Sequence, residues 1–322
     1  MEQTLDDVEF IFVDDCSPDE SIDILKHVLT DYPQRKVQII RHEENRGLPA
    51  ARNTGLSVVT GEYIFHCDSD DYLERDALEK MYKKAVATNA DIVYSDWYLT
   101  YPQHERYMTC PDYDSPEEAL RGLLHGTMKY NVWNKLVKRE LYNEDETRRY
   151  ENENNDNREG SFCLNSNTDN RFFYHPNGIR FPEGHGMGED MTMILLFARA
   201  QKVAYLPYPT YHYVRQNENA FTAAPSEASY EDLKYNADRI IATLQGQLSE
   251  CDLACFKLNV KFPFLISSRC ADYDRWTQWF PEANTYILSH QTSTRTRLLE
   301  KCATWHFHLP LRLHFYLLQY LQ

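Results

Sequence analysis

The stretch that decides the fold reads Glu62-Tyr63-Ile64-Phe65-His66-Cys67 and is followed at once by Asp68-Ser69-Asp70-Asp71. Its apolar part is long enough for a buried strand, and carboxylates follow directly where that strand would end. Residues two apart on an extended chain point the same way, so we expect Asp68 and Asp70 to face one ligand. Carboxylate oxygens suit Mg²⁺ or Mn²⁺, which keep water and phosphate oxygens in their remaining positions. The pattern therefore predicts a divalent metal and a diphosphate at the edge of a sheet.

The same acidic run has plainer interpretations. An Asp-x-Asp spacing alone is unspecific, because aspartates are also common in solvated turns. Asp71 with Glu74 three residues on forms a capping-box pattern, which would open a helix over residues 77–86. Asp71 is therefore expected either at the ligand site or at the start of that helix.

A second acidic pair follows another expected strand. Residues 8–13, VEFIFV, run directly into Asp14 and Asp15, and Ser17-Pro18 beyond them marks the start of a helix. The other expected elements are a helix over about 18–30, a strand over 37–40, a helix opened by Pro49, a helix from Glu74 and a strand over 91–94. Strands that alternate with helices predict a parallel sheet with right-handed crossovers, whose ligands bind beyond the carboxyl ends of the strands. Both acidic clusters lie at such ends.

Together these segments resemble the family 2 glycosyltransferases of the GT-A fold. The matching segments are residues 12–19 (FVDDCSPD), 45–53 (NRGLPAARN), 61–64 (GEYI), 68–71 (DSDD), 132–136 (VWNKL) and 188–190 (GED). Their order and spacing agree with the family over about residues 5–220. The resemblance implies an α/β fold of the GT-A type over residues 1–223, with a Rossmann-like, mostly parallel sheet flanked by helices. Helical patterning then predicts a helical carboxyl-terminal extension over 224–322.

The resemblance also implies roles for the acidic residues of the donor site. In the family, the second acid of the first pair contacts the nucleotide base. This acid corresponds to Asp15 here, with Asp14 beside it. The Asp-x-Asp holds the ribose and the metal, which falls on Asp68 and Asp70. The arginine of the second helix lies next to the nucleotide, which falls on Arg52. The implied cofactor is Mn²⁺ or Mg²⁺, and the implied donor is a nucleotide-diphosphate sugar, with a UDP-sugar favoured.

The acidic pair that follows Gly188 supplies the catalytic base in the family, which falls on Asp190 or its neighbour Glu189. The resemblance implies an inverting, metal-dependent transfer of a hexose to an acceptor hydroxyl, in which the base takes the hydroxyl proton. The glycines around residues 184–188 allow a close-approaching loop at this point. Without the resemblance, Asp190 would also be explained as a cap of the apolar helix over 191–200.

Four further residues are candidate contacts for the donor or the acceptor. Trp133 and Lys135 suit a sugar ring and a phosphate, although a half-buried strand tryptophan is an equally good explanation of Trp133. His185 lies in the glycine-rich loop, where a histidine is more often simply exposed. The family's counterpart of the strand that carries Tyr213 often ends in Tyr-x-Arg. The resemblance therefore places Arg215 near the diphosphate or the acceptor, against the alternative of a plain edge strand.

The chain departs from the family's pattern at its beginning. Family members start with an apolar strand, a Pro-x-Tyr-Asn turn and a helix before the segment that here begins at Met1. Two expectations follow, and the sequence does not choose between them. Either the native start lies upstream, or this polypeptide is a truncated form that binds a sugar nucleotide with little or no turnover.

Bulk properties exclude one class of partner. A net charge of −15 disfavours nucleic acid as a general ligand, because phosphate backbones require a basic surface. The eight cysteines show no paired metal spacing, and Cys251 with Cys255 is explained as a helical pair. With no amino-terminal signal sequence, reduced thiols and a cytoplasmic location are expected.

Two segments interrupt the pattern. Residues 143–170 are crowded with polar and charged side chains and are expected to form a solvated or disordered insertion, either neutral or an acceptor-side lid. Residues 293–322 interleave basic and aromatic side chains, which suits peripheral contact with the anionic inner face of a membrane, near a lipid-linked acceptor. Packing within the protein or a dimer contact explains the same composition equally well.

The sequence thus predicts an inverting GT-A glycosyltransferase of bacterial surface or capsular polysaccharide synthesis, acting on a glycan or lipid-linked acceptor. Two alternatives remain at this point. A haloacid-dehalogenase-like phosphatase also places Asp-x-Asp after a strand, but it would leave Asp14 and Asp15 without a role. A truncated, catalytically inactive paralogue would keep the nucleotide site and lose turnover.

Overall fold

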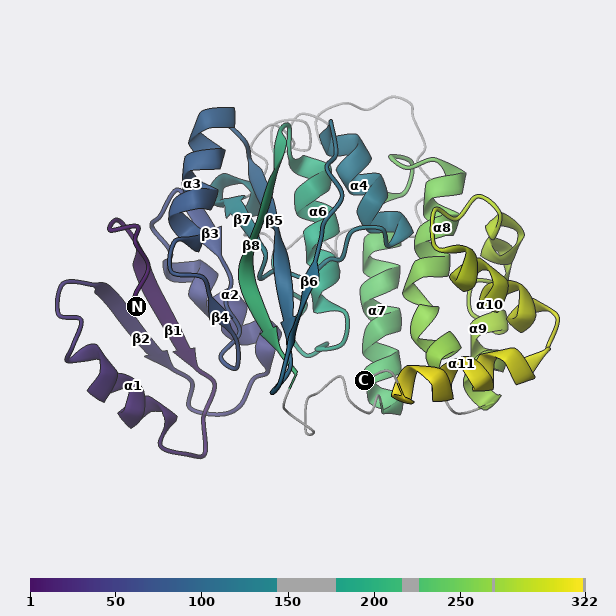
Figure 1. Cartoon of the computed structure of the whole chain (residues 1–322), viewed down its shortest axis with the longest axis horizontal. Helices are drawn as coiled ribbons and strands as arrows, with labels where there is room; N and C mark the ends of the chain where they lie inside the picture. The colour runs from purple at the N-terminus through teal and green to yellow at the C-terminus, as the bar shows by residue number, and fades with distance from the viewer. Residues whose placement is uncertain (144–177, 216–225, 268–269, 321–322) are drawn as a thin grey trace, which may run out of the picture. The chain divides into compact units, whose positions relative to one another are not determined.

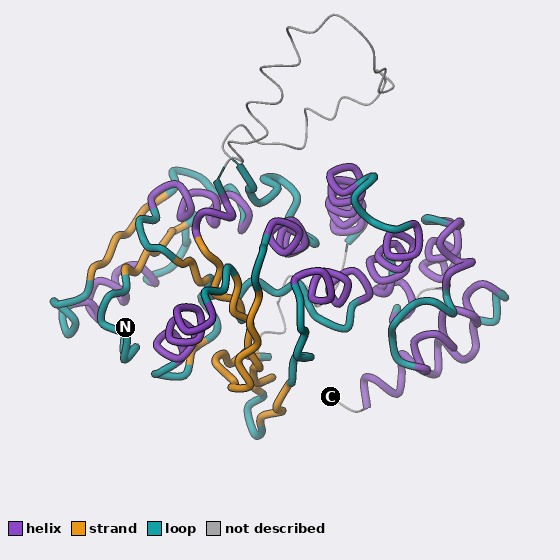
Figure 2. The backbone as a smooth tube through the Cα atoms, turned by 90° about the horizontal axis from the view of Figure 1, so that it is seen from above, coloured by secondary structure: helices purple, strands orange, loops and turns teal. Residues whose placement is uncertain are grey.

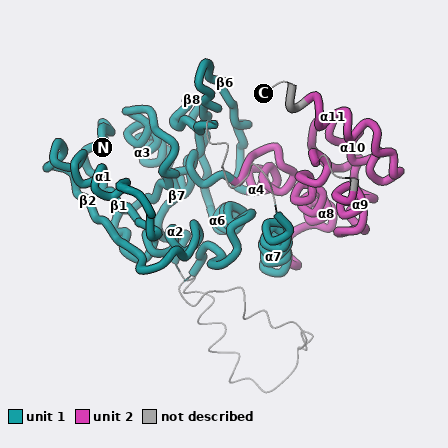
Figure 3. The backbone as a smooth tube through the Cα atoms, turned by 90° about the horizontal axis from the view of Figure 1, so that it is seen from below, with its two compact units in different colours: residues 1–116, 131–243 teal, residues 117–130, 244–322 magenta. Residues whose placement is uncertain are grey.

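The computed structural model describes residues 1–143, 178–215, 226–267 and 270–320. The chain divides into two compact units, drawn in different colours in Figure 3. The first comprises residues 1–116 and 131–243, and the second comprises residues 117–130 and 244–322. The polar insertion expected over 143–170 lies, apart from Asn143, outside the described residues.

The first unit contains every strand of the described chain. Figure 1 labels these strands, and Figure 2 draws them in orange. The strands are β1 (Glu9–Asp14), β2 (Lys36–Arg41), β3 (Tyr63–Phe65), β4 (Tyr72–Leu73), β5 (Ile92–Thr100), β6 (Glu105–Met108), β7 (Lys135–Lys138) and β8 (Val203–Val214). A two-stranded sheet pairs β1 with β2, and a six-stranded sheet has the order β3-β7-β5-β8-β4, with β6 pairing β5. The strands expected over 8–13, 37–40, 62–67 and 91–94 all form, although the third is only three residues long.

The α/β class is confirmed, but the sheet is mixed instead of mostly parallel. Only β1–β2 and β5–β8 pair in parallel within the described chain. The short strands β3, β4, β6 and β7 run antiparallel to their neighbours. The physical reason is local: β6 returns directly from β5 as a hairpin, and β4 pairs with the far end of β8 just after the acidic run. Alternation of strands and helices in the sequence does not reveal such short return strands.

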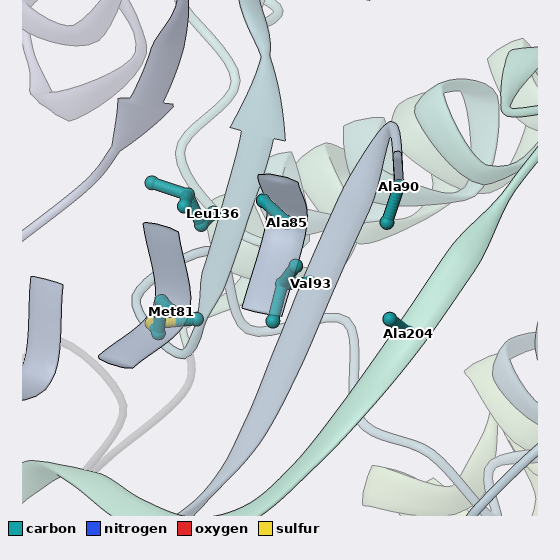
Figure 4. Packing of buried hydrophobic residues seen from close by; sticks show 6 residues of the cluster. All are labelled: Met81, Ala85, Ala90, Val93, Leu136 and Ala204. Atoms are coloured by element: carbon teal, nitrogen blue, oxygen red, sulfur yellow. The ribbon is translucent and has the colours of Figure 1, made fainter. Parts of the chain in front are cut away.

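Helices cover both faces of the central sheet. The helices of the first unit are α1 (Ser21–Leu29), α2 (Leu48–Val58), α3 (Ala77–Thr88), α6 (Thr192–Arg199) and α7 (Glu227–Leu244), with 3-10 turns η1 (Arg139–Tyr142) and η3 (Glu189–Met191). Met81 of α3 packs against Val93 of β5 in the buried cluster of Figure 4. The next residue, Tyr94, contacts Phe197 of α6 with ring centroids 6.4 Å apart. Because successive residues of a strand point to opposite faces, α3 and α6 lie on opposite sides of β5.

The capping-box prediction for α3 is wrong. The helix begins at Ala77 with Asp76 at its N-cap, and no side chain caps it. Asp71 instead accepts hydrogen bonds from the hydroxyl of Tyr211 and the backbone N–H of Val214, both in β8. A sheet contact between residues more than a hundred positions apart therefore overrides the local signal.

Every element of the second unit in the described chain is helical, as expected for the carboxyl-terminal part. Its elements are α4 (Pro116–His125, of which Pro116 belongs to the first unit), α8 (Glu250–Val260), η4 (Phe262–Ile266), α9 (Cys270–Gln278), η5 (Pro281–Tyr286), α10 (Thr294–Thr304) and α11 (His308–Tyr320). Cys251 and Cys255 are free and lie one turn apart on α8, as expected. Among the described residues, no helix combines the length and the apolar character needed to cross a bilayer.

Candidate active site

The centre of the site is a buried arginine that joins three carboxylates from distant parts of the chain. Arg52 projects from α2 and is 8 % exposed. Its Nη2 donates to Asp68 Oδ1 over 3.0 Å, and its Nη1 donates to Glu189 Oε1 over 3.0 Å and to Asp190 Oδ1 over 2.9 Å. The Phe181 ring lies beneath the guanidinium, with its centroid 5.3 Å from the guanidinium carbon. The structure thus brings together the Asp-x-Asp segment and the acidic loop that the sequence singled out separately.

The charges of this cluster do not balance, because one cation faces three acids. Burial, reinforced by Asp190, raises the pKa of Glu189 to about 8 against the opposing effect of Arg52. Burial also raises the pKa of Asp68, although Arg52 lowers it. Burial alone would lower the pKa of Arg52, but the three carboxylates raise it overall, so the guanidinium stays charged. Glu189 therefore holds a proton near neutral pH in the ligand-free cluster.

The acidic loop is held by helix α7. Gly188 has φ +83°, a conformation that a side chain would strain, and it leads directly into η3 with Glu189 and Asp190. Asp232 of α7 accepts through Oδ2 from the backbone N–H groups of Gly186 at 3.0 Å and Met187 at 3.4 Å.

Two further α7 residues extend this support. Asn236 donates to the carbonyl oxygen of Met187 over 2.9 Å. Arg239 donates to Thr192 Oγ1 at the start of α6 and to the carbonyl oxygen of Arg180. Sequence reasoning missed these α7 residues, since their helical pattern marked only the apolar face.

Asp15 occupies a separate, fully bonded position beyond β1. Its Oδ1 lies 2.6 Å from His42 Nδ1 and accepts from the backbone N–H of Arg46 over 2.9 Å. Its Oδ2 accepts from the backbone N–H of Gly47 over 2.7 Å. Burial opposes ionisation, but these bonds prevail and lower the pKa of Asp15. His42 was missed from the sequence, although the quoted NRG segment pointed to the loop that supplies the two N–H groups.

Asp14 is buried and braces the turn after β1. It is 3 % exposed and accepts from the backbone N–H of Ser17 through Oδ1 over 2.8 Å. Arg41 Nε lies 3.1 Å from Asp14 Oδ2. The bond from Ser17 lowers the pKa of Asp14. These contacts explain Asp14 as a support of the turn that carries Asp15.

The Asp-x-Asp segment presents two carboxylates with different exposures. Asp70 is exposed, whereas the Asp68 side chain is 26 % exposed and bound to Arg52 through one oxygen. Tyr211 of β8 fixes the turn, because its hydroxyl accepts from the backbone N–H of Asp68 at 3.0 Å and donates to Asp71 at 2.8 Å. Burial raises the pKa of Asp71 to about 6. Oxygen donors of this kind fit Mn²⁺ or Mg²⁺, so the residues present are compatible with the expected metal.

The four candidate contact residues lie in different environments. Trp133 is 6 % exposed and stacks on Tyr211, with ring centroids 4.5 Å apart. Lys135 is fully buried, and its Nζ donates to the carbonyl oxygen of Asn131 and to Asn134 Oδ1. Burial lowers the pKa of Lys135 to about 8.

The other two candidates lie nearer the surface. His185 Nδ1 lies 3.1 Å from Asp232 Oδ1, and the His185 ring stacks on Tyr235 at 3.6 Å between centroids. Arg215 follows the last residue of β8 and has an exposed side chain. His185 is thus part of the contact between the acidic loop and α7, and Arg215 lies at a strand end.

Comparison with known proteins decides the family. The model of glycosyl transferase family 2 matches residues 1–170, more than half of the chain. The chain belongs to glycosyltransferase family 2. The resemblance seen in the sequence is confirmed, and the phosphatase alternative is wrong, because this family transfers sugars.

Relatives and solved structures agree with this membership. The chain is 30 % identical over 273 residues to the glycosyltransferase GlyG of Streptococcus pneumoniae, covering 81 % of this chain and 76 % of GlyG. It is 27 % identical over 281 residues to a cholesterol galactosyltransferase of Borreliella burgdorferi, covering 82 % and 68 % of the two chains. The structure of S. aureus TarS 1-349 in complex with UDP-GlcNAc matches with a TM-score of 0.63 at 16 % identity, covering 100 % of this chain and 86 % of TarS. This family 2 protein therefore has the GT-A fold that its sequence predicts.

Proposed function

We propose that this family 2 glycosyltransferase is an inverting, metal-dependent enzyme that moves a hexose from a UDP-sugar to an acceptor hydroxyl in bacterial polysaccharide synthesis. The main support for this proposal is the contact of Arg52 with three acids, Asp68, Glu189 and Asp190. It links the segment that would hold the donor to the acids that would activate the acceptor. TarS, which shares the fold, has been solved in complex with UDP-GlcNAc, and this supports a uridine nucleotide as the first donor to test.

We assign the catalytic base to Asp190. Its side chain is 28 % exposed and accessible to an acceptor, whereas that of Glu189 is 11 % exposed. Burial raises the pKa of Glu189 to about 8, so in the ligand-free cluster most Glu189 side chains already hold a proton near neutral pH. Glu189 then supports Asp190 by keeping the excess negative charge of the cluster low.

The proposed step balances as a single displacement. Asp190 takes the proton of the acceptor hydroxyl as its oxygen bonds to the anomeric carbon of the sugar. The bond from that carbon to the phosphate oxygen breaks, and the nucleoside diphosphate leaves with the electron pair. Asp68 and Asp70 would hold Mn²⁺ or Mg²⁺, which supplies neutralisation of the leaving diphosphate when bound. Asp15 would accept from the nucleotide base, with Asp14 bracing its turn.

The remaining candidates take supporting roles in this proposal. Trp133 is already covered by the rings of Tyr211 and Tyr213, so it shapes the wall of the site more than it stacks on a sugar. Arg215 is exposed at the end of β8, from where it would contact the diphosphate or the acceptor. Lys135 and His185 would hold the neighbouring loops.

The experiment that tests the proposal is calorimetric titration of the full chain with UDP, with and without Mn²⁺, followed by transfer assays with UDP-hexoses. Metal-dependent UDP binding that the Asp70→Ala variant loses, together with transfer, is the expected result. Metal-dependent binding without turnover would favour the inactive paralogue instead. Absence of UDP binding would contradict the donor assignment.

We further propose that α11 rests on the inner face of the cell membrane, near a lipid-linked acceptor. The apolar residues Leu309, Leu313 and Leu317 are more than half exposed on this helix. Residues 293–322 also carry Arg295, Arg297, Lys301 and Arg312 against the single acid Glu300, in a chain of net charge −15. An apolar face beside basic side chains is the composition of a helix that lies in an anionic interface.

Flotation with vesicles tests this contact. We expect binding to vesicles that contain phosphatidylglycerol and little binding to neutral phosphatidylcholine vesicles. The Leu313→Glu variant should abolish binding, and Leu288→Glu, at a 70 % exposed position outside the segment, should not. Equal binding of both variants would refute a membrane role for α11.

A further inference from the structure

The second compact unit contains a cluster of metal-ligating side chains that is separate from the proposed donor site. Asp274 lies in α9, His306 lies in the turn after α10, and His308 is the first residue of α11. These three helices belong to the second unit, drawn in magenta in Figure 3. One ligand atom from each of the three side chains lies within 4.8 Å of the other two. We propose that Asp274, His306 and His308 form a site for a transition-metal ion, with Zn²⁺ as the ion that the donor set suits best.

The spacing of the donor atoms suits a metal better than hydrogen bonds. His306 Nδ1 lies 3.6 Å and His308 Nε2 lies 3.9 Å from the same oxygen, Asp274 Oδ1. Both distances exceed the range of about 2.7–3.2 Å expected of a hydrogen bond. Ligand atoms about 2.0–2.1 Å from a tetrahedral Zn²⁺ are roughly 3.3–3.4 Å apart. Shared coordination would therefore require each nitrogen to move only a few tenths of an ångström closer to Asp274 Oδ1.

One of the ring nitrogens is buried without a partner. His308 Nε2 has no hydrogen-bond partner among the described residues, although it is shielded from solvent. The His308 ring packs against Tyr273, with centroids 5.2 Å apart. Because buried polar atoms in folded proteins are nearly always satisfied, this nitrogen calls for a ligand. Asp274 Oδ1 lies 3.9 Å from this nitrogen.

The backbone explains why two histidines face one helix. The backbone N–H of His306 donates to Ala303, and that of Phe307 donates to Cys302, which closes α10 as a Schellman motif. His306 occupies the left-handed position of that motif, with φ +54°, where glycine is usual. The next helix, α11, starts at His308. The turn thus directs His306 and His308 toward Asp274 of α9.

The donor set is typical of zinc. Two imidazoles and one carboxylate leave an open position for water, an arrangement that borderline ions such as Zn²⁺ accept. The His306 and Asp274 side chains are 67 % and 50 % exposed, so an ion can enter from solvent. A bound ion would tie α9 to the corner between α10 and α11 and would stabilise the second unit.

The test uses the full chain, stripped with a chelator and titrated with ZnCl₂ by calorimetry. The Asp70→Ala background removes competition from the proposed donor site. We expect one bound equivalent of Zn²⁺ and a rise of several degrees in the thermal midpoint of unfolding. When Co²⁺ replaces Zn²⁺, we expect a visible absorption spectrum typical of coordination that includes nitrogen. The His308→Ala and Asp274→Asn variants should each weaken Zn²⁺ binding at least tenfold.

The matched control is His27→Ala, which removes an exposed histidine from α1 in the first unit. Its Zn²⁺ affinity should equal that of the background. Equal affinity of the His308→Ala and His27→Ala variants would overturn the proposal, as would absence of binding. If His308→Ala does not fold, the Zn²⁺ affinity of Asp274→Asn alone tests the proposal, because asparagine has nearly the same shape as aspartate and should preserve the fold.

Discussion

Arg52 Nη2 lies 3.0 Å from Asp68 Oδ1, and the pair is largely buried. Arg52 belongs to α2, whereas Asp68 lies in the acidic run after β3. The same guanidinium bonds Glu189 and Asp190, which lie more than 130 positions further along the chain. The Arg52 side chain therefore links the Asp-x-Asp segment to the acidic loop.

Replacing Arg52 should damage both stability and turnover. The Arg52→Ala variant leaves three buried or half-buried acids unpaired, which typically costs about 3–5 kcal/mol of the free energy of unfolding. Arg52→Lys should recover only part of this loss, because an ammonium group cannot reproduce the planar fork of the guanidinium. Urea denaturation measures the effect. The control Arg75→Ala removes an exposed pair with Glu2 and should change stability by less than about 1 kcal/mol.

Glu189 should make the stability of the metal-free protein depend on pH. Its folded-state pKa of about 8 lies above the ordinary value of 4.5, so the folded protein keeps a proton that the unfolded chain releases between these values. The stabilisation from this proton is complete below about pH 4.5 and is lost as the pH rises through about 8. Glu189→Gln stays neutral, so its thermal midpoint should rise relative to that of the parent between pH 5 and pH 9. A constant difference would refute the raised pKa.

The two acids of the loop should differ in their effect on turnover. Asp190→Asn removes the proposed base and should lower kcat by about 10²–10⁴-fold while UDP affinity changes little. Glu189→Gln keeps a neutral group in place and should lower kcat far less near neutral pH. Steady-state transfer assays and UDP titration of both variants measure the difference. The reverse order of the two effects would move the base to Glu189.

Asp232 should position the acidic loop from α7. Asp232 Oδ2 accepts hydrogen bonds from the backbone N–H groups of Gly186 and Met187. Asp232→Asn replaces this carboxylate with a neutral amide, so the loop should be held less firmly. We expect kcat to fall roughly tenfold, with UDP affinity unchanged, because small misplacements of a catalytic group reduce rates strongly. Glu231→Gln is the matched control, since it removes an exposed carboxylate from the neighbouring position of α7. A parallel loss in both variants would point to the helix as a whole.

The sequence predicted the local elements well because their signals are short-range. Apolar runs ending in aspartates indicated β1 and β3, and Pro49 indicated the start of α2. The motif segments also identified the family, which the comparison confirmed. By contrast, the mixed direction of the sheet was not predicted, because pairing partners such as β4 and β8 are far apart in the chain.

The sequence by itself determined the family, the α/β class and the acids worth testing, since each depends on residue types at fixed local spacings. Only the tertiary structure decided what those acids contact. Asp71 serves β8 instead of a helix start, Glu189 is buried beside Arg52, and Asp232 of α7 supports the loop. The physical reason is that hydrogen bonds and burial join residues by their distance in space, which chain packing sets and local periodicity does not encode.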